Sequence, residues 1–102
     1  MTKERILKSS NECKKKIDEY LQCWNIEQER YPSDKFIDID HECSKVYAHL
    51  SFMIEQIPKF LTDEKIEKSM RWLGFIQGVL WVYSEFTIDD LKNQNKSISN
   101  ID

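Results

Sequence analysis

The sequence predicts an all-α fold, an antiparallel three-helix bundle with a short fourth helix at its C-terminal end. Only two of the 102 residues are glycine and two are proline, too few for the many turns of a β-sandwich or barrel. Apolar residues recur at steps of three and four along two long stretches, which is the spacing of one helix face. Short connections are expected between the helices, and they make neighbouring helices antiparallel. We expect residues 1–96 to form a single helical domain and residues 97–102 a frayed polar tail.

Residues 3–31 are predicted to form one long helix. Thr2 is placed to cap its start, and Glu4 lies in the first turn, where a negative charge interacts favourably with the helix dipole. Pro32 is expected to end it, because the residue before a proline is pushed out of the helical conformation. The seam of this helix alternates steps of four and three and includes two polar members. It runs through Ile6, Ser10, Cys13, Ile17, Tyr20, Trp24, Glu27 and Tyr31.

A second helix is predicted to begin directly after the turn at Pro32, with Ser33 or Asp34 as its cap. Its seam has no polar member and keeps the helical spacing throughout. The seam consists of Phe36, Ile39, Cys43, Val46, Leu50, Met53 and Ile57. We expect Pro58 to end this helix.

The third and fourth helices are predicted to start with one pattern, a threonine cap followed by two acidic residues in the first turn. These residues are Thr62, Asp63 and Glu64 in the third helix and Thr87, Asp89 and Asp90 in the fourth. The fourth helix is short, about residues 88–95.

The third helix is unusual because it is apolar nearly all round from Met70 to Tyr83. Two other helices can cover about two-thirds of its circumference, so the remainder must meet solvent, a second subunit or a ligand. Both glycines of the chain lie in this helix, where each costs about 1 kcal/mol relative to alanine. On a helical wheel one face collects Arg71, Gly74, Gln77, Gly78, Trp81 and Glu85.

Two interpretations of Gly74 and Gly78 remain open. In the first, another helix backbone packs closely on them, either within the chain or across a subunit interface. In the second, they floor a ligand site in which Arg71 pairs with a phosphate or carboxylate, Gln77 donates a hydrogen bond and Trp81 or Trp72 stacks. The two interpretations are compatible if the site lies between subunits.

Net charge and cysteine content indicate which partners and which compartment to expect. The net charge of −3 lacks the basic excess of nucleic-acid-binding proteins, and we interpret the run at residues 14–16 as a solvated helix face. Three cysteines without a C-x-x-C motif indicate a reducing compartment, so we expect a cytoplasmic protein. The N-terminus has no apolar signal core, and the longest mostly apolar run is too short to span a bilayer. Neither a membrane nor nucleic acid is expected as a partner.

No complete catalytic motif is present. Asp38 and His41 have the spacing of half a di-iron motif, but the second half is missing. Glu64 and Glu67 match the first carboxylate pair of the all-helical nucleotide pyrophosphatases, again without a second pair. Residues 86–92 begin like a helix-turn-helix motif that lacks its recognition helix. We therefore expect a non-enzymatic protein with no catalytic residues, no metal site and no cofactor.

The core of the third helix reads R-W-L-G-F-I-Q-G-V-L-W and is followed by F-T-I-D-D-L-K. This pattern, over about residues 65–96, resembles small uncharacterised bacteriophage accessory proteins. The resemblance implies a phage protein acting in the bacterial cytoplasm and carries no catalytic residue with it.

Many phage proteins of this size and helical type inhibit host defence by binding. The expected function is a homo-oligomer that inhibits host defence by sequestering a nucleotide-like signal or a host factor. Its expected binding residues are Arg71, Trp72, Gly74, Gln77, Gly78 and Trp81. The alternatives are an inhibitor that docks directly on a host enzyme, of the anti-CRISPR or anti-restriction type, and a nucleotide-acting enzyme.

Overall fold

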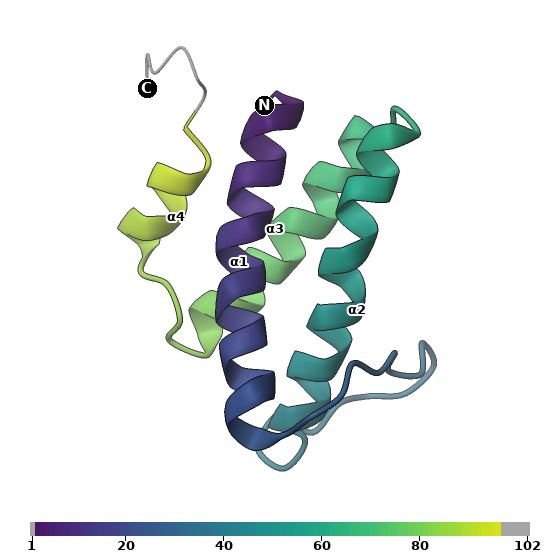
Figure 1. Ribbon diagram of the computed structural model, residues 1–102. Helices are drawn as coiled ribbons and strands as arrows, with labels where there is room; N and C mark the ends of the chain where they lie inside the picture. Colours follow the sequence, from purple (N-terminus) through teal and green to yellow (C-terminus); the bar gives the residue numbers. More distant parts are fainter. Residues whose placement is uncertain (1, 97–102) are drawn as a thin grey trace.

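The computed structural model describes residues 2–96, and within them it is all-helical (Figure 1). Its helices are α1 (Lys3–Trp24), α2 (Cys43–Thr62), α3 (Ile66–Val82) and α4 (Ile88–Gln94). α1 and α2 lie side by side, and α3 crosses behind both of them at an angle. The short α4 lies on the side of α1 that faces away from α2. Three packed helices with a short fourth helix are therefore confirmed.

The core lies where α1, α2 and α3 meet. Ile6, Ile17, Ile57, Ile76 and Leu80 have no exposed surface there. α1 and α2 contribute to this core along their predicted seams, which are shorter than expected, and the predicted seam member Trp24 is wrong because it is 65% exposed. α3 contributes Leu73 together with Ile76 and Leu80. The packing of these apolar side chains is what holds the three helices together.

α1 ends at Trp24, earlier than the predicted end at residue 31. Asn25 adopts the left-handed conformation with a φ of 54°, and the N–H of Ile26 donates to the carbonyl of Leu21 at 2.9 Å. Asparagine tolerates this conformation better than most residues and is a common stop for a helix. The predicted helix continued past this stop, so Tyr31 lies outside α1.

α2 begins at Cys43, much later than the predicted start at Ser33 or Asp34. The Asp38 side chain accepts a hydrogen bond from the N–H of Asp40 at 3.1 Å, and the Asp38 carbonyl accepts one from the N–H of Glu42 at 2.7 Å. Aspartate favours such local turns because its side chain competes for backbone hydrogen bonds. Residues 25–42 therefore form a long connection without helix or strand.

The boundary between α2 and α3 also differs from the prediction. Pro58 does not end α2, and Thr62 does not cap α3. The hydroxyl of Thr62 donates to the carbonyl of Pro58 at 3.0 Å, within the last turn of α2. Glu64 then takes a φ of 60°, so Asp63 and Glu64 lie in the connection before α3.

The threonine caps at the other two helix starts are confirmed. The hydroxyl oxygen of Thr2 accepts a hydrogen bond from the N–H of Arg5 at 3.1 Å. Thr87 and Asp90 form a reciprocal capping box at the start of α4. The frayed tail predicted for residues 97–102 lies outside the described residues.

The scarcity of glycine has a consequence at the helix ends. α1, α2 and α3 are each followed by a non-glycine residue in the left-handed conformation, namely Asn25, Glu64 and Ser84. Ser84 has a φ of 63°, and the N–H of the next residue, Glu85, donates to the carbonyl of Leu80 at 2.8 Å. This conformation costs a residue with a Cβ about 1 kcal/mol or more, whereas glycine adopts it without that cost.

We predict that Ser84→Gly raises the free energy of unfolding by about 1 kcal/mol, measured by urea denaturation. The matched control is Ser44→Gly, because Ser44 is also exposed but lies in the first turn of α2. That control should lower the free energy of unfolding by about 0.5–1 kcal/mol. Equal destabilisation by both variants would contradict the assignment.

Candidate binding cavity

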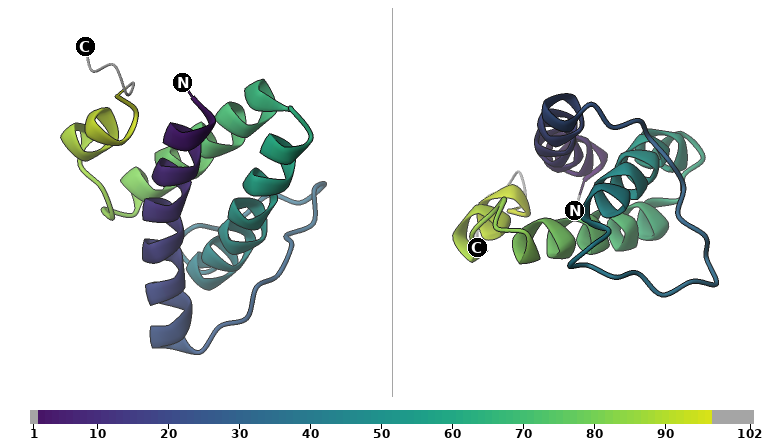
Figure 2. Two further views of the ribbon diagram at one scale, coloured as in Figure 1. Left: turned by 45° about the horizontal axis from the view of Figure 1, so that its top comes forward. Right: turned by 90° about the horizontal axis from the view of Figure 1, so that it is seen from below.

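A cavity of about 540 Å³ lies between α2, α3 and the connection of residues 25–42, which we call the strap. Seen from below, the strap runs in a wide arc from the end of α1 around α2 and back to the start of α2 (Figure 2). The cavity is lined by Ile37 from the strap, Leu50 and Met53 from α2, and Phe75 and Val79 from α3. Its volume falls within the range of about 300–1,000 Å³ that is typical of small-molecule sites.

The first part of the strap is held against α2 by polar contacts. The side-chain amide of Gln28 donates to the carbonyl and the hydroxyl of Ser51, both at 3.2 Å. The backbone N–H of Tyr31 donates to Nδ1 of His49 at 3.0 Å. These contacts fix the strap over the middle of α2, where the cavity begins.

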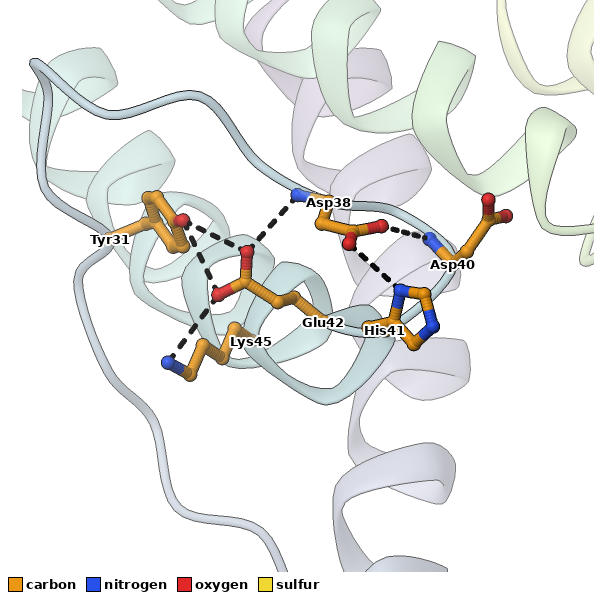
Figure 3. A network of polar contacts seen from close by, with 6 residues as sticks. All are labelled: Tyr31, Asp38, Asp40, His41, Glu42 and Lys45. Atoms are coloured by element: carbon orange, nitrogen blue, oxygen red, sulfur yellow. Dashed lines mark hydrogen bonds and ion pairs between the residues drawn. The ribbon is translucent and has the colours of Figure 1, made fainter.

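The last part of the strap is held by the carboxylate of Glu42 (Figure 3). Its Oε1 accepts a hydrogen bond from the N–H of Asp38 at 3.1 Å, and Lys45 Nζ lies 3.4 Å from its Oε2. The phenol oxygen of Tyr31 lies 3.2 Å from Oε1 and donates to this carboxylate. The backbone hydrogen bond, above all, lowers the pKa of Glu42, so this carboxylate is charged at neutral pH. Glu42 thus joins both halves of the strap to the start of α2.

His49 is the titratable group of α2 that lines the cavity. Because its Nδ1 accepts a hydrogen bond from the strap, the neutral ring carries its hydrogen on Nε2. Burial, and then the positive charge of Arg30, lower the pKa of His49 from its ordinary value of 6.5. The ring is therefore neutral at neutral pH, and its role there is to accept the N–H of Tyr31.

The rim of the cavity combines exposed apolar side chains with positive charge. Phe75 and Val82 of α3 are 55% and 59% exposed, and both line the cavity. Arg30 and Lys35 of the strap also line it, and the Arg30 guanidinium lies 5.4 Å from the centre of the Phe52 ring. The arrangement can bind an apolar molecule, since covering such side chains removes apolar surface from water.

The structure distributes the six predicted site residues over three places. Trp72 lines the cavity and is half-buried. Its ring lies edge-on to that of Phe60, and the two ring centres are 4.8 Å apart. Gln77 is buried in the interior. The other four are exposed on a different side of α3; they are Arg71, Gly74, Gly78 and Trp81.

Gln77 does not lie on the exposed face to which the helical wheel assigned it. Its Nε2 donates to Oδ1 of Asn95 at 2.8 Å and to Oε1 of Gln94 at 3.1 Å. Asn95 Nδ2 donates back to Oε1 of Gln77 at 3.1 Å. The amide is thus satisfied within the chain and attaches the end of α4 to α3, so it is not available to a ligand.

The two glycines do not mark close helix packing within the chain. Among the described residues, no atom beyond the local helix backbone lies within 4 Å of the position that a Cβ would take at Gly74 or Gly78. Both glycines lie instead on an open surface next to Trp81, which is 48% exposed. We call Arg71, Gly74, Gly78 and Trp81 the glycine face.

The residues that hold the strap were missed by sequence reasoning. Tyr31 was assigned to the seam of the first helix, and Glu42 and His49 to the body of the second. One available signal was Asn25, a residue type that commonly ends helices. Ending α1 there leaves a long connection that contains Ile37 and Ile39, and such apolar residues indicate a segment that packs on the helices.

Two further findings concern the described residues as a whole. Within residues 2–96, no three His, Cys, Asp or Glu side chains converge to hold a metal ion. Asp38 and His41, which have the spacing of half a di-iron motif, instead pair with each other, and Oδ2 of Asp38 lies 2.8 Å from Nδ1 of His41. No helix in the same range is long and apolar enough to cross a membrane.

Comparisons of the chain with protein-family models, curated proteins and solved structures find no match.

We predict that the strap weakens on mild acidification because of His49. The pKa of His49 is lower in the folded protein than in the unfolded chain, so its contribution to stability is fully present above about pH 6.5. That contribution is lost as the pH falls through the lowered pKa. Urea denaturation between about pH 8 and pH 5 measures it as a decrease in the free energy of unfolding.

One variant tests the assignment to His49. His49→Asn keeps a hydrogen-bond acceptor but does not titrate, so its stability should depend less on pH over this range. An unchanged pH dependence in His49→Asn would contradict the prediction.

Proposed function

We propose that this chain is a non-enzymatic binding protein that takes up its ligand in the cavity beneath the strap. The observation that carries the proposal is an apolar cavity of about 540 Å³ whose rim leaves Phe75 and Val82 more than half exposed. Burial of apolar surface contributes about 25 cal/mol per Å². Binding of a ligand that covers these side chains is therefore favourable, and it requires no chemical step.

The polar groups near the cavity support binding rather than turnover. Nδ1 of His49 accepts the N–H of Tyr31, and the carboxylate of Glu42 accepts hydrogen bonds from Tyr31 and Asp38. Each of these side chains therefore has a structural role in holding the strap. The proposal therefore treats these residues as the frame of a binding site.

The resemblance of residues 65–96 to phage accessory proteins supports a role in the cytoplasm of an infected bacterium. There the protein would inhibit host defence by sequestering a host factor or a signalling molecule, as predicted from the sequence. The proposal keeps the antiparallel order of neighbouring helices and the single domain over residues 1–96 that the sequence predicts.

We predict that the wild-type protein enhances the fluorescence of anilinonaphthalene sulfonate, a dye that binds apolar cavities. Val79→Trp should abolish most of this enhancement, because Val79 lines the cavity and the larger ring fills it. The matched control is Ile88→Trp, which places the same ring at an exposed position on α4. Full dye binding by Val79→Trp, with helicity unchanged by circular dichroism, would contradict the proposal.

The glycine face supports a second candidate, a surface that docks on another protein. Arg71, Gly74, Gly78 and Trp81 are all exposed, and exposed tryptophan and arginine are frequent anchors of protein interfaces. Its occupant is either a second copy of this chain, giving the homo-oligomer that the sequence predicts, or a host enzyme that the protein inhibits.

Gly78→Leu tests the homo-oligomer. The added side chain meets open space in a single chain, so the fold should persist and helicity should not decrease. We predict an oligomer for the wild type at high micromolar concentration and a shift towards monomer for Gly78→Leu, by native mass spectrometry and light scattering. Lys92→Leu, at an exposed position of α4, should leave the mass unchanged. A monomeric wild type would contradict the prediction.

A further inference from the structure

We infer that the cavity binds an amphipathic monoanion, a carboxylate with an apolar chain, whose head group lies at Arg30 and Lys35. This inference rests on the proposed function and adds the chemical class of the ligand. It draws on the distribution of charge and of hydrogen-bonding groups around the cavity.

The charge around the cavity has one sign. Arg30 and Lys35 line it, whereas none of its lining residues is aspartate or glutamate. Neither cation forms a salt bridge to any carboxylate of the described chain. The two acidic neighbours in sequence, Glu29 and Asp34, lie outside the cavity lining. Lys35 also lines a neighbouring surface pocket with Glu29 and Glu42, whereas Arg30 does not. An anionic group at this rim therefore meets two cations that form no salt bridge within the described chain.

The two cations that line the cavity, Arg30 and Lys35, both belong to the strap, and His49, which lines it from α2, is neutral at neutral pH. Lys68 of α3 lies outside the lining, with its Nζ 5.7 Å from the centre of the Trp72 ring. The Arg30 guanidinium is held over the Phe52 ring, 5.4 Å from its centre, at one side of the cavity. Cations that both come from one lining segment indicate an anionic end on the ligand, and the guanidinium is well suited to a carboxylate.

The opposite walls are apolar. They consist of Val46, Leu50 and Met53 from α2 and Trp72, Phe75 and Val79 from α3. A hydrocarbon chain fits these walls because it requires no hydrogen bonds. The ribose and base of a nucleotide would lose their hydrogen bonds to water against such walls without replacement, which is costly. The lining thus favours an apolar carboxylate over the nucleotide-like ligand expected from the sequence.

The test compares decanoate, decanol and decylammonium, which share one chain and differ in the charge of the head group. Isothermal titration calorimetry with the full chain should give a dissociation constant for decanoate about tenfold lower than that for decanol. Decylammonium should bind most weakly of the three. Raising the ionic strength should weaken decanoate binding and leave decanol binding unchanged, because the head group meets exposed charges.

Paired variants separate the head group from the chain. The double variant with Arg30→Gln and Lys35→Gln should reduce the affinity for decanoate to that for decanol. Its affinity for decanol should not change. The control, Lys15→Gln with Lys92→Gln, removes the same charge from exposed positions on α1 and α4 and should preserve the preference. Val79→Trp should abolish binding of both ligands.

The outcomes distinguish the inference from the proposed function. Equal affinity for decanoate and decanol, lost in Val79→Trp, would overturn the anionic head group and leave the binding function standing. Preference for decylammonium over decanoate would overturn the ligand class in the same way. If no probe binds and the dye fluorescence is also unaffected by Val79→Trp, both the inference and the proposed function fail.

Discussion

The attachment of the strap to α2 is the constraint on which the cavity depends. Ordering a segment as long as residues 25–42 costs about 1–2 kcal/mol of conformational entropy per residue, and its contacts must offset that cost. In the first part of the strap they are made by Gln28, Glu29 and Tyr31 with α2, and in the last part by Asp38 with Glu42. The stretch between Tyr31 and Asp38 is fixed on both sides, and a space remains between it, α2 and α3.

The same constraint explains why α3 is apolar on nearly every side. One side, with Ile76 and Leu80, completes the core, and Gln77 attaches α4. A third side, with Phe75 and Val79, forms the wall of the cavity. The glycine face, with Trp81, makes up the rest. The surface of α3 that the other helices do not cover is thus divided between the cavity and the glycine face, and each has its own proposed occupant.

Sequence patterns predicted the features that depend on neighbouring residues. The caps at Thr2 and Thr87 are confirmed because capping is local, and most of each apolar seam within the observed helices is buried. The exception is Trp24 at the end of α1, which is 65% exposed. Periodicity failed in the strap, because Phe36 and Ile39 continue the spacing of α2 although both are exposed and the Asp38 turn precedes the helix. The place of Gln77 depends on where α4 packs, and the cavity depends on three segments that meet only in the folded chain. No local pattern carries that information.

Amide hydrogen exchange in the strap tests the account most directly. The N–H groups of Tyr31 and Asp38 donate to His49 and Glu42, so both should exchange more slowly than that of Phe36, which donates no hydrogen bond within the described chain. Glu42→Ala should remove the protection of Asp38 while the amides of the core helices stay protected. Exchange of Tyr31 and Asp38 at the rates of an unfolded chain in the wild-type protein would contradict an anchored strap, and with it the cavity.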